Sequence, residues 1–92
     1  MLRRLQGRHA EAVELAASAA EGLRAHPSKI VRATASAALG SALLAAGRPA
    51  EALGPLREAV RLFAEKQSAV SPDQADARDE LARAEAAVQR TP

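Results

Sequence analysis

The apolar part of this sequence consists mostly of alanine, and this feature restricts the folds open to the chain. Alanine accounts for 25 of the 92 residues, compared with 11 leucines, five valines and a single phenylalanine. Alanine is the strongest helix former, whereas strands favour branched and aromatic side chains, which are scarce here. We therefore expect an all-α fold in which the backbones of neighbouring helices approach one another closely.

Glycine, proline and serine residues divide the sequence into helical segments. Gly7 is expected to separate a short N-terminal stub from the first full helix, and Pro27 cannot continue that helix. Gly47 is suited to ending a helix in the left-handed conformation, and Ser28 and Ser71 are suited to capping the helices that follow them. The expected helical segments are a stub at 1–5 and full helices at 9–25, 28–46, 49–66 and 71–89.

An internal repeat gives the sharpest indication of the architecture. The heptapeptide GRHAEAV, which begins at Gly7, returns 40 residues later as GRPAEAL, which begins at Gly47, with five of the seven positions identical. Periods of this size indicate stacked helix–turn–helix units. The segments LGSAL, from Leu39, and ALGPL, from Ala52, place small residues where two helices would cross and leucines beside them.

These motifs resemble the two-helix signature of the tetratricopeptide repeat, with helix A around Gly40 and helix B around Ala52. The sequence departs from that signature at Ser36, where tryptophan is usual, and at Ala64, where proline is usual. Its period of 40–42 residues exceeds the usual 34 or so, as in some bacterial variants of the family.

The resemblance implies one domain over residues 1–90, built of antiparallel hairpins stacked as a short α-solenoid. A simple helical bundle is the alternative. Within the domain, the expected parts are a partial first repeat at 1–26, a complete repeat at 28–66 and a C-terminal capping helix at 71–90.

In the tetratricopeptide family, helix A lines an inner, concave face that binds a peptide or a helix of another protein. The resemblance implies that this chain is a non-catalytic protein–protein interaction module. Carried over position by position, the concave face has small or weakly polar residues on the second full helix and mainly charged residues on the last one. The implied partner-binding residues are Thr34, Ala37, Ser41, Leu44, Asp76, Asp79 and Arg83.

The helix at 9–25 has no complete helix A beside it. Its apolar stripe, at helical spacing, consists of Ala12, Ala16, Ala19 and Leu23, with Leu15 close by. Leaving such a stripe in water forfeits about 1–2 kcal/mol for each larger side chain. We therefore expect a sister chain, upstream sequence or a partner to cover it. The residues expected to mediate self-association, as in a homodimer, are Ala12, Leu15, Ala16 and Leu23.

The sequence lacks the residue arrangements typical of an enzyme or a metal site. It contains no cysteine, and its two histidines, His9 and His26, stand at opposite ends of one expected helix, roughly 25 Å apart. The carboxylates from Asp73 to Glu80 are better suited to stabilising the start of a helix than to holding a cation, and Asp79 is spaced to pair with Arg83. No catalytic residue, metal or cofactor is therefore expected.

Charge and hydropathy favour a cytoplasmic protein. The formal net charge is only +2, so nucleic acid is not an expected partner despite the basic group Arg3, Arg4 and Arg8. Phe63, the only aromatic residue, shares a helical face with core positions and is not expected to stack on bases. No apolar run reaches the roughly 18–20 residues that cross a membrane, and the N-terminus does not have the pattern of a signal peptide.

Two alternatives remain open at this point. The chain is also suited to being a structural helical segment of a larger bacterial transcriptional regulator or signalling ATPase. The other alternative is a small helical DNA-binding domain. Salt dependence separates that domain from a peptide-binding module, because only DNA affinity falls steeply with ionic strength.

Overall fold

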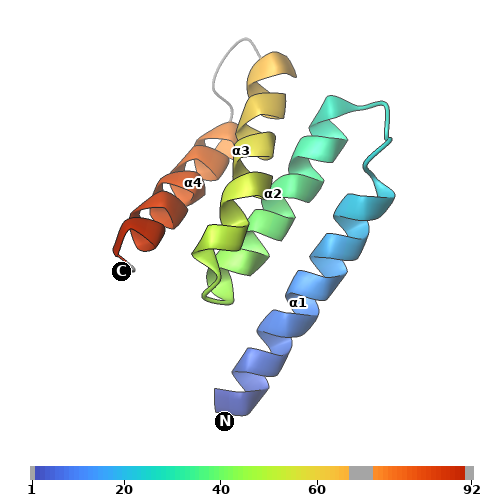
Figure 1. Ribbon diagram of the computed structural model, residues 1–92. Helices are drawn as coiled ribbons and strands as arrows, with labels where there is room; N and C mark the ends of the chain where they lie inside the picture. The colour runs from blue at the N-terminus through green and yellow to red at the C-terminus, as the bar shows by residue number, and fades with distance from the viewer. Residues whose placement is uncertain (1, 67–71, 91–92) are drawn as a thin grey trace.

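The computed structural model describes residues 2–66 and 72–90, which form four helices (Figure 1). In chain order these are α1 (Leu2–Gly22), α2 (Lys29–Ala45), α3 (Pro49–Lys66) and α4 (Pro72–Arg90). The described residues contain no strand, so the all-α fold class expected from the composition is confirmed.

The N-terminal stub is not a separate element, and the expected break at Gly7 is wrong. α1 continues through Gly7 and ends at Gly22. A single glycine within a helix costs only about 1 kcal/mol relative to alanine, and the good helix formers on both sides outweigh that cost. The helix also ends before the expected residue 25, in a turn where the His26 N–H donates to the Leu23 carbonyl oxygen at 2.9 Å.

The turns on either side of α2 follow local sequence signals. Ser28 caps the helix, because the Val31 N–H donates to the Ser28 Oγ at 3.3 Å. Gly47 has a φ of 76°, which is the left-handed conformation expected of it. The Arg48 N–H donates to the Leu43 carbonyl oxygen at 2.9 Å and so closes the end of α2 before α3 begins.

α4 begins at Pro72, the first-turn position at which proline's missing N–H costs nothing. Ser71, which is expected to cap this helix, lies outside the described residues. The helix ends at Arg90, one residue beyond the expected end.

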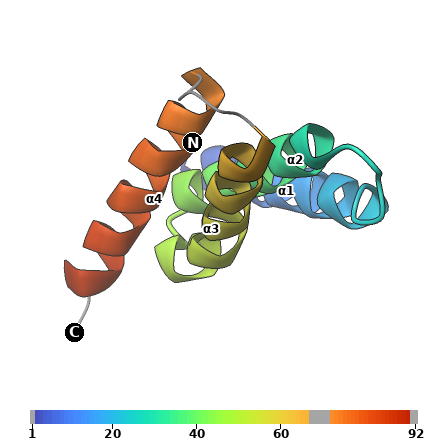
Figure 2. The same ribbon diagram turned by 90° about the horizontal axis from the view of Figure 1, so that it is seen from above.

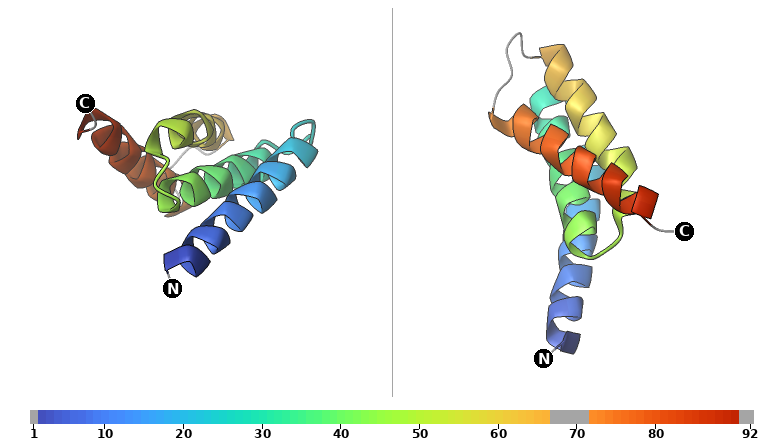
Figure 3. Two further views of the ribbon diagram at one scale, coloured as in Figure 1. Left: turned by 60° about the horizontal axis from the view of Figure 1, so that its bottom comes forward. Right: turned by 90° about the vertical axis from the view of Figure 1, so that its left-hand side faces the viewer.

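Each helix packs against the next one along the chain, and α4 also contacts α2. α2 and α3 form a central antiparallel hairpin, with α1 on one side of it and α4 on the other (Figure 2, Figure 3). At the level of the backbone, α1 lies against α2 alone among the described helices. α2 is therefore the helix around which the other three are arranged.

Small side chains lie where the helices meet. Buried alanines stand beside leucine in both groups of buried residues that form the core, with a valine in the first group and a phenylalanine in the second. Phe63 is 1% exposed, so its expected place in the core is confirmed. The two groups are Val13, Leu43, Ala52, Leu56 and Ala84, and Ala33, Ala59, Leu62, Phe63 and Ala77.

The face of α1 that packs on the hairpin differs from the expected stripe. Among residues 8–22, Val13 is the buried one, whereas Ala12 and Ala19 are exposed. A valine buries more apolar area than an alanine, so the helix turns toward the position that offers the larger gain. Ala16 and Leu23, which belong to the expected stripe, are half-buried.

Gly40 allows α2 and α3 to approach closely. It is buried, and a Cβ built on it would lie 2.5 Å from both Cγ and Cδ2 of Leu56. Leu56 is itself 0% exposed, so its side chain has little room to give way. The absence of a side chain at residue 40 is therefore a requirement of this interface.

We predict that Gly40→Ala lowers the free energy of unfolding by about 1–3 kcal/mol, the usual cost of overpacking a core. Gly54→Ala is the matched control, because this glycine lies inside α3 with nothing within 4 Å of its Cβ position. The control should raise stability by about 0.5–1 kcal/mol through helix propensity. Urea unfolding followed by circular dichroism measures both values. A Gly40→Ala variant as stable as the wild type would contradict the close packing of α2 on α3.

Candidate functional site

The residues expected to form the concave face gather between α2 and α4. Two adjoining hollows of about 250 and 370 Å³ lie there, and both are lined by Ser41 and Glu80. We call the two hollows together the α2/α4 groove. Its lining includes six of the seven expected partner-binding residues, namely Thr34, Ala37, Ser41, Leu44, Asp76 and Arg83.

Asp79 is the expected residue that does not line the groove. Its carboxylate forms an ion pair with the Arg83 guanidinium at 2.9 Å, one turn along α4. This is the i,i+4 pair that the sequence spacing predicts. Both side chains are mostly exposed, at 62% for Asp79 and 70% for Arg83, so the pair contributes little to stability. It does neutralise Arg83, the one cationic side chain among the described residues that line the groove.

Glu80, which belongs to both hollows, was not predicted from the sequence. The Ser41 hydroxyl donates to Glu80 Oε2 and so connects α2 to α4 across the groove. The signal was present, because the 42-residue offset between the two helices places Glu80 at the position of Ala38. Ala38 follows Ala37 in α2 and also lines the groove.

The α2 wall of the groove offers a ligand little polarity. Ala37, Ala38 and Ala45 contribute only methyl groups to it. The Thr34 hydroxyl donates to the Ile30 carbonyl oxygen at 2.8 Å, so this donor is used within α2 itself. The α2 wall is therefore mainly apolar, and most of the polar character of the groove comes from α4.

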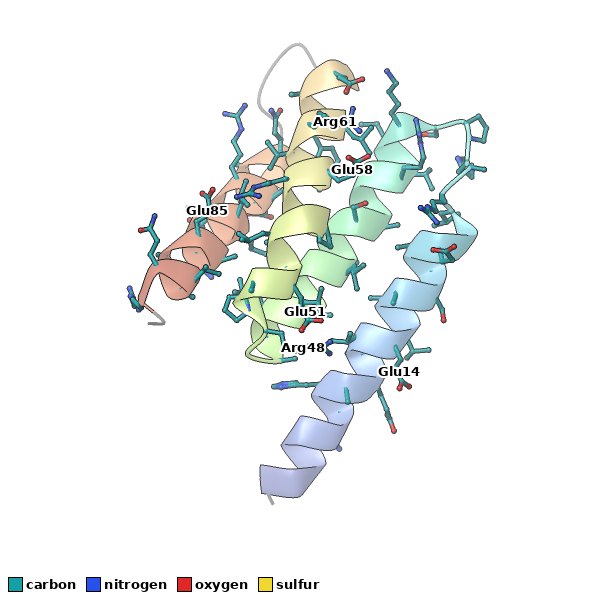
Figure 4. The ribbon with its side chains drawn as sticks, in the orientation of Figure 1. Glu14, Arg48, Glu51, Glu58, Arg61 and Glu85 are labelled. Carbon is teal, nitrogen blue, oxygen red and sulfur yellow. The ribbon has the colours of Figure 1, made fainter. Side chains whose placement is uncertain are left out.

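Two carboxylates of the groove have no cationic partner. Asp76 and Glu80 form no ion pair in the described part of the chain. In contrast, every other described carboxylate side chain of α3 and α4 is paired, for example Glu58 with Arg61, which are labelled near each other in Figure 4. Because Arg83 is already neutralised, the groove carries two uncompensated negative charges. The pairs are Glu51–Arg48, Glu58–Arg61, Glu65–Lys29, Asp79–Arg83 and Glu85–Arg57.

The residues expected to mediate self-association differ in their exposure to solvent. Leu15 is 72% exposed and Ala12 is exposed, so both remain available on the surface of α1. Ala16 is half-buried. Leu23 is also half-buried and lines a separate groove between α1, α2 and α3.

The described residues contain no group of three histidine, cysteine, aspartate or glutamate side chains that could hold a metal ion. His26 has a local role, because its Nδ1 accepts a hydrogen bond from the Ser28 N–H at 3.0 Å. None of the helices in residues 2–66 and 72–90 combines the length and the apolar character needed to cross a membrane.

No family model, no curated protein and no solved structure matches the chain. The tetratricopeptide resemblance therefore rests on the sequence motifs, and membership of that family stays a prediction. The helical arrangement itself is consistent with a stack of helical hairpins and with a bundle.

The shifted pKa values belong to ion pairs outside the groove. At the turn between α2 and α3, the hydrogen bond from Arg48 lowers the pKa of Glu51, and Glu51 in turn raises the pKa of Arg48. At the other end of the same hairpin, the hydrogen bond from Lys29 at 2.8 Å lowers the pKa of Glu65, and Arg61 adds a smaller effect. Lys29–Glu65 joins α2 to α3, whereas Arg48–Glu51 lies within the turn and the start of α3. All four side chains are substantially exposed, so both pairs contribute little to stability.

We predict that Lys29→Gln raises the pKa of Glu65 toward its ordinary value, although not completely, because Arg61 Nη1 remains 2.6 Å from the carboxylate. A lowered pKa stabilises the folded state above the ordinary pKa of glutamate, and this contribution disappears as the pH falls through the lowered value. The variant should therefore lose less stability on acidification. NMR titration of the Glu65 side chain measures the shift. Arg48→Gln should leave the Glu65 pKa unchanged, and an unchanged value in Lys29→Gln would refute the assignment.

Proposed function

We propose that the chain is a non-catalytic, tetratricopeptide-like interaction module of the cytoplasm, which binds a peptide or a helix of a partner protein in the α2/α4 groove. The supporting observation is that residues far apart in the sequence line one groove, in which a wall of small residues faces a charged wall. Small side chains on one wall allow the backbone of a partner to lie close, as in helix-in-groove recognition.

The charges of the groove favour a partner with basic side chains. Asp76 and Glu80 are uncompensated, whereas Arg83 already has Asp79 as its partner. Opposite charges across an interface accelerate association and exclude partners of like charge. The expected occupant is a short amphipathic segment that places lysine or arginine against α4 and an apolar side chain against Leu44.

Selection from a displayed library of random peptides, with the whole chain as the target, tests this proposal. The enriched peptides should combine basic and apolar residues at helical spacing. Their affinities are then measured with synthetic peptides by fluorescence anisotropy. A selection that enriches no peptide would refute the proposed function, and enrichment of acidic peptides would refute the partner chemistry alone.

We predict that the double variant Asp76→Asn/Glu80→Gln weakens binding of the selected peptides by about tenfold or more, because it removes the two uncompensated charges and keeps the side-chain shapes. The matched control is Glu11→Gln/Glu14→Gln, which removes the same number of charges from exposed positions of α1. Equal affinities for the two double variants would show that the peptides bind elsewhere.

A second role, self-association, is favoured by an apolar strip on α1 that no described helix covers. Leu15 is 72% exposed, and Ala12 and Ala19, three residues before it and four after it, are exposed as well. Residues at this spacing lie on one side of a helix. We propose that the strips of two copies cover each other.

We predict that the protein sediments as a dimer at micromolar concentration and that Leu15→Glu returns it to a monomer, because the dimer would have to enclose the new carboxylate. Ala10→Glu adds the same charge at another exposed position of the same helix and should leave the dimer intact. Sedimentation velocity distinguishes the two states. A wild-type monomer at all concentrations would exclude this role and leave the groove proposal standing.

A further inference from the structure

A second groove lies on the opposite side of α2 from the α2/α4 groove. The backbones of α1 and α3 both pack against α2 but not against each other, and the space between them has a volume of about 450 Å³. Arg32, Ser36 and Leu39 of α2 line it. At 100° per residue these three positions face away from Thr34 and Ser41, so opposite faces of α2 line the two grooves. We call this second space the Arg32 groove.

Aliphatic side chains from all three helices line the Arg32 groove. Its volume falls within the range of small-molecule sites, which are about 300–1,000 Å³ and mostly apolar with a few polar groups. The aliphatic residues are Ala17, Ala20, Leu23, Leu39 and Leu62.

Among the charged side chains that line this groove, Arg32 is the one without an ion pair in the described part of the chain. Glu21 pairs with Arg24 at 3.1 Å, and Glu58 pairs with Arg61 at 2.6 Å. Arg32 is half-buried, and its Nε is enclosed by the protein without a hydrogen-bond acceptor. A guanidinium that is partly withdrawn from water and has no counterion is stabilised by an anion bound beside it.

We propose that the Arg32 groove binds a monocarboxylate carried on an apolar chain. Because Nε is enclosed, the carboxylate meets the two terminal nitrogens of the Arg32 guanidinium in charge-assisted hydrogen bonds. The aliphatic lining receives the chain. One uncompensated positive charge matches the single negative charge of a monocarboxylate.

A carboxylate joined to an apolar chain is found in a fatty acid and at the C-terminus of a peptide that ends in aliphatic residues. Two probes distinguish the sources: decanoate represents the fatty acid, and N-acetyl-trileucine with a free carboxylate represents the peptide terminus. Binding of either probe supports the shared chemistry, and the stronger one identifies the source.

Isothermal titration calorimetry on the whole chain, with each probe below its aggregating concentration, tests the inference. Decanol, which has the chain but no charge, should bind at least about tenfold more weakly than decanoate, and Arg32→Gln should weaken decanoate binding to a similar degree. Arg32→Lys keeps the charge without the planar fork and should retain part of the affinity. Arg78→Gln removes an exposed arginine of α4 and should bind as the wild type does.

Equal affinity of the wild type for decanoate and decanol would overturn the inference, and this comparison holds even where Arg32→Gln does not fold. Equal decanoate affinity of the wild type and a folded Arg32→Gln, checked by circular dichroism, would also overturn it, as would failure of both probes to bind. Asp76→Asn/Glu80→Gln should leave decanoate binding unchanged. The Arg32 groove and the α2/α4 groove are therefore tested independently.

Discussion

The distance between the two central helices depends on the contact of Gly40 with Leu56, since the leucine side chain occupies the space that a Cβ at residue 40 would take. Ala33, Ala52 and Ala59, all 0% exposed, extend this close approach along the hairpin. A chain with few large apolar residues gains its packing energy through short contact distances, because dispersion attraction fades quickly as surfaces separate. α1 and α4 then dock on the two sides of the hairpin that this contact creates.

The small residues of α2 also explain why both grooves lie along it. A helix that contacts three others would ordinarily be surrounded by large side chains, but α2 presents alanine, serine and glycine on much of its surface. Toward α4, the hydrogen bond between Ser41 and Glu80 joins two residues that line both hollows. Toward α1 and α3, the longer side chain of Arg32 reaches into the space that small neighbours leave open.

Local signals made the central hairpin predictable. Ser28, Gly47 and the start of α3 depend on hydrogen bonds between residues close in the sequence, and the fold class follows from composition. The internal repeat also predicted most of the residues that line the α2/α4 groove. Three features could not be read in this way. α1 continues through Gly7 because the residues on both sides of this glycine favour helix. Val13 is buried in place of the expected stripe because the helix that packs against α1 decides which of its side chains are enclosed. The Arg32 groove depends on the separation of α1 from α3, which no local signal in the sequence predicts.

The backbone of α1 packs against α2 alone among the described helices, and Val13 is its one buried side chain among residues 8–22. Elements with so few buried contacts open at a lower free energy than the core does. α1 also forms one wall of the Arg32 groove and carries the exposed strip around Leu15. A ligand bound between α1, α2 and α3 would therefore stabilise the docked position of α1 without any change in the hairpin.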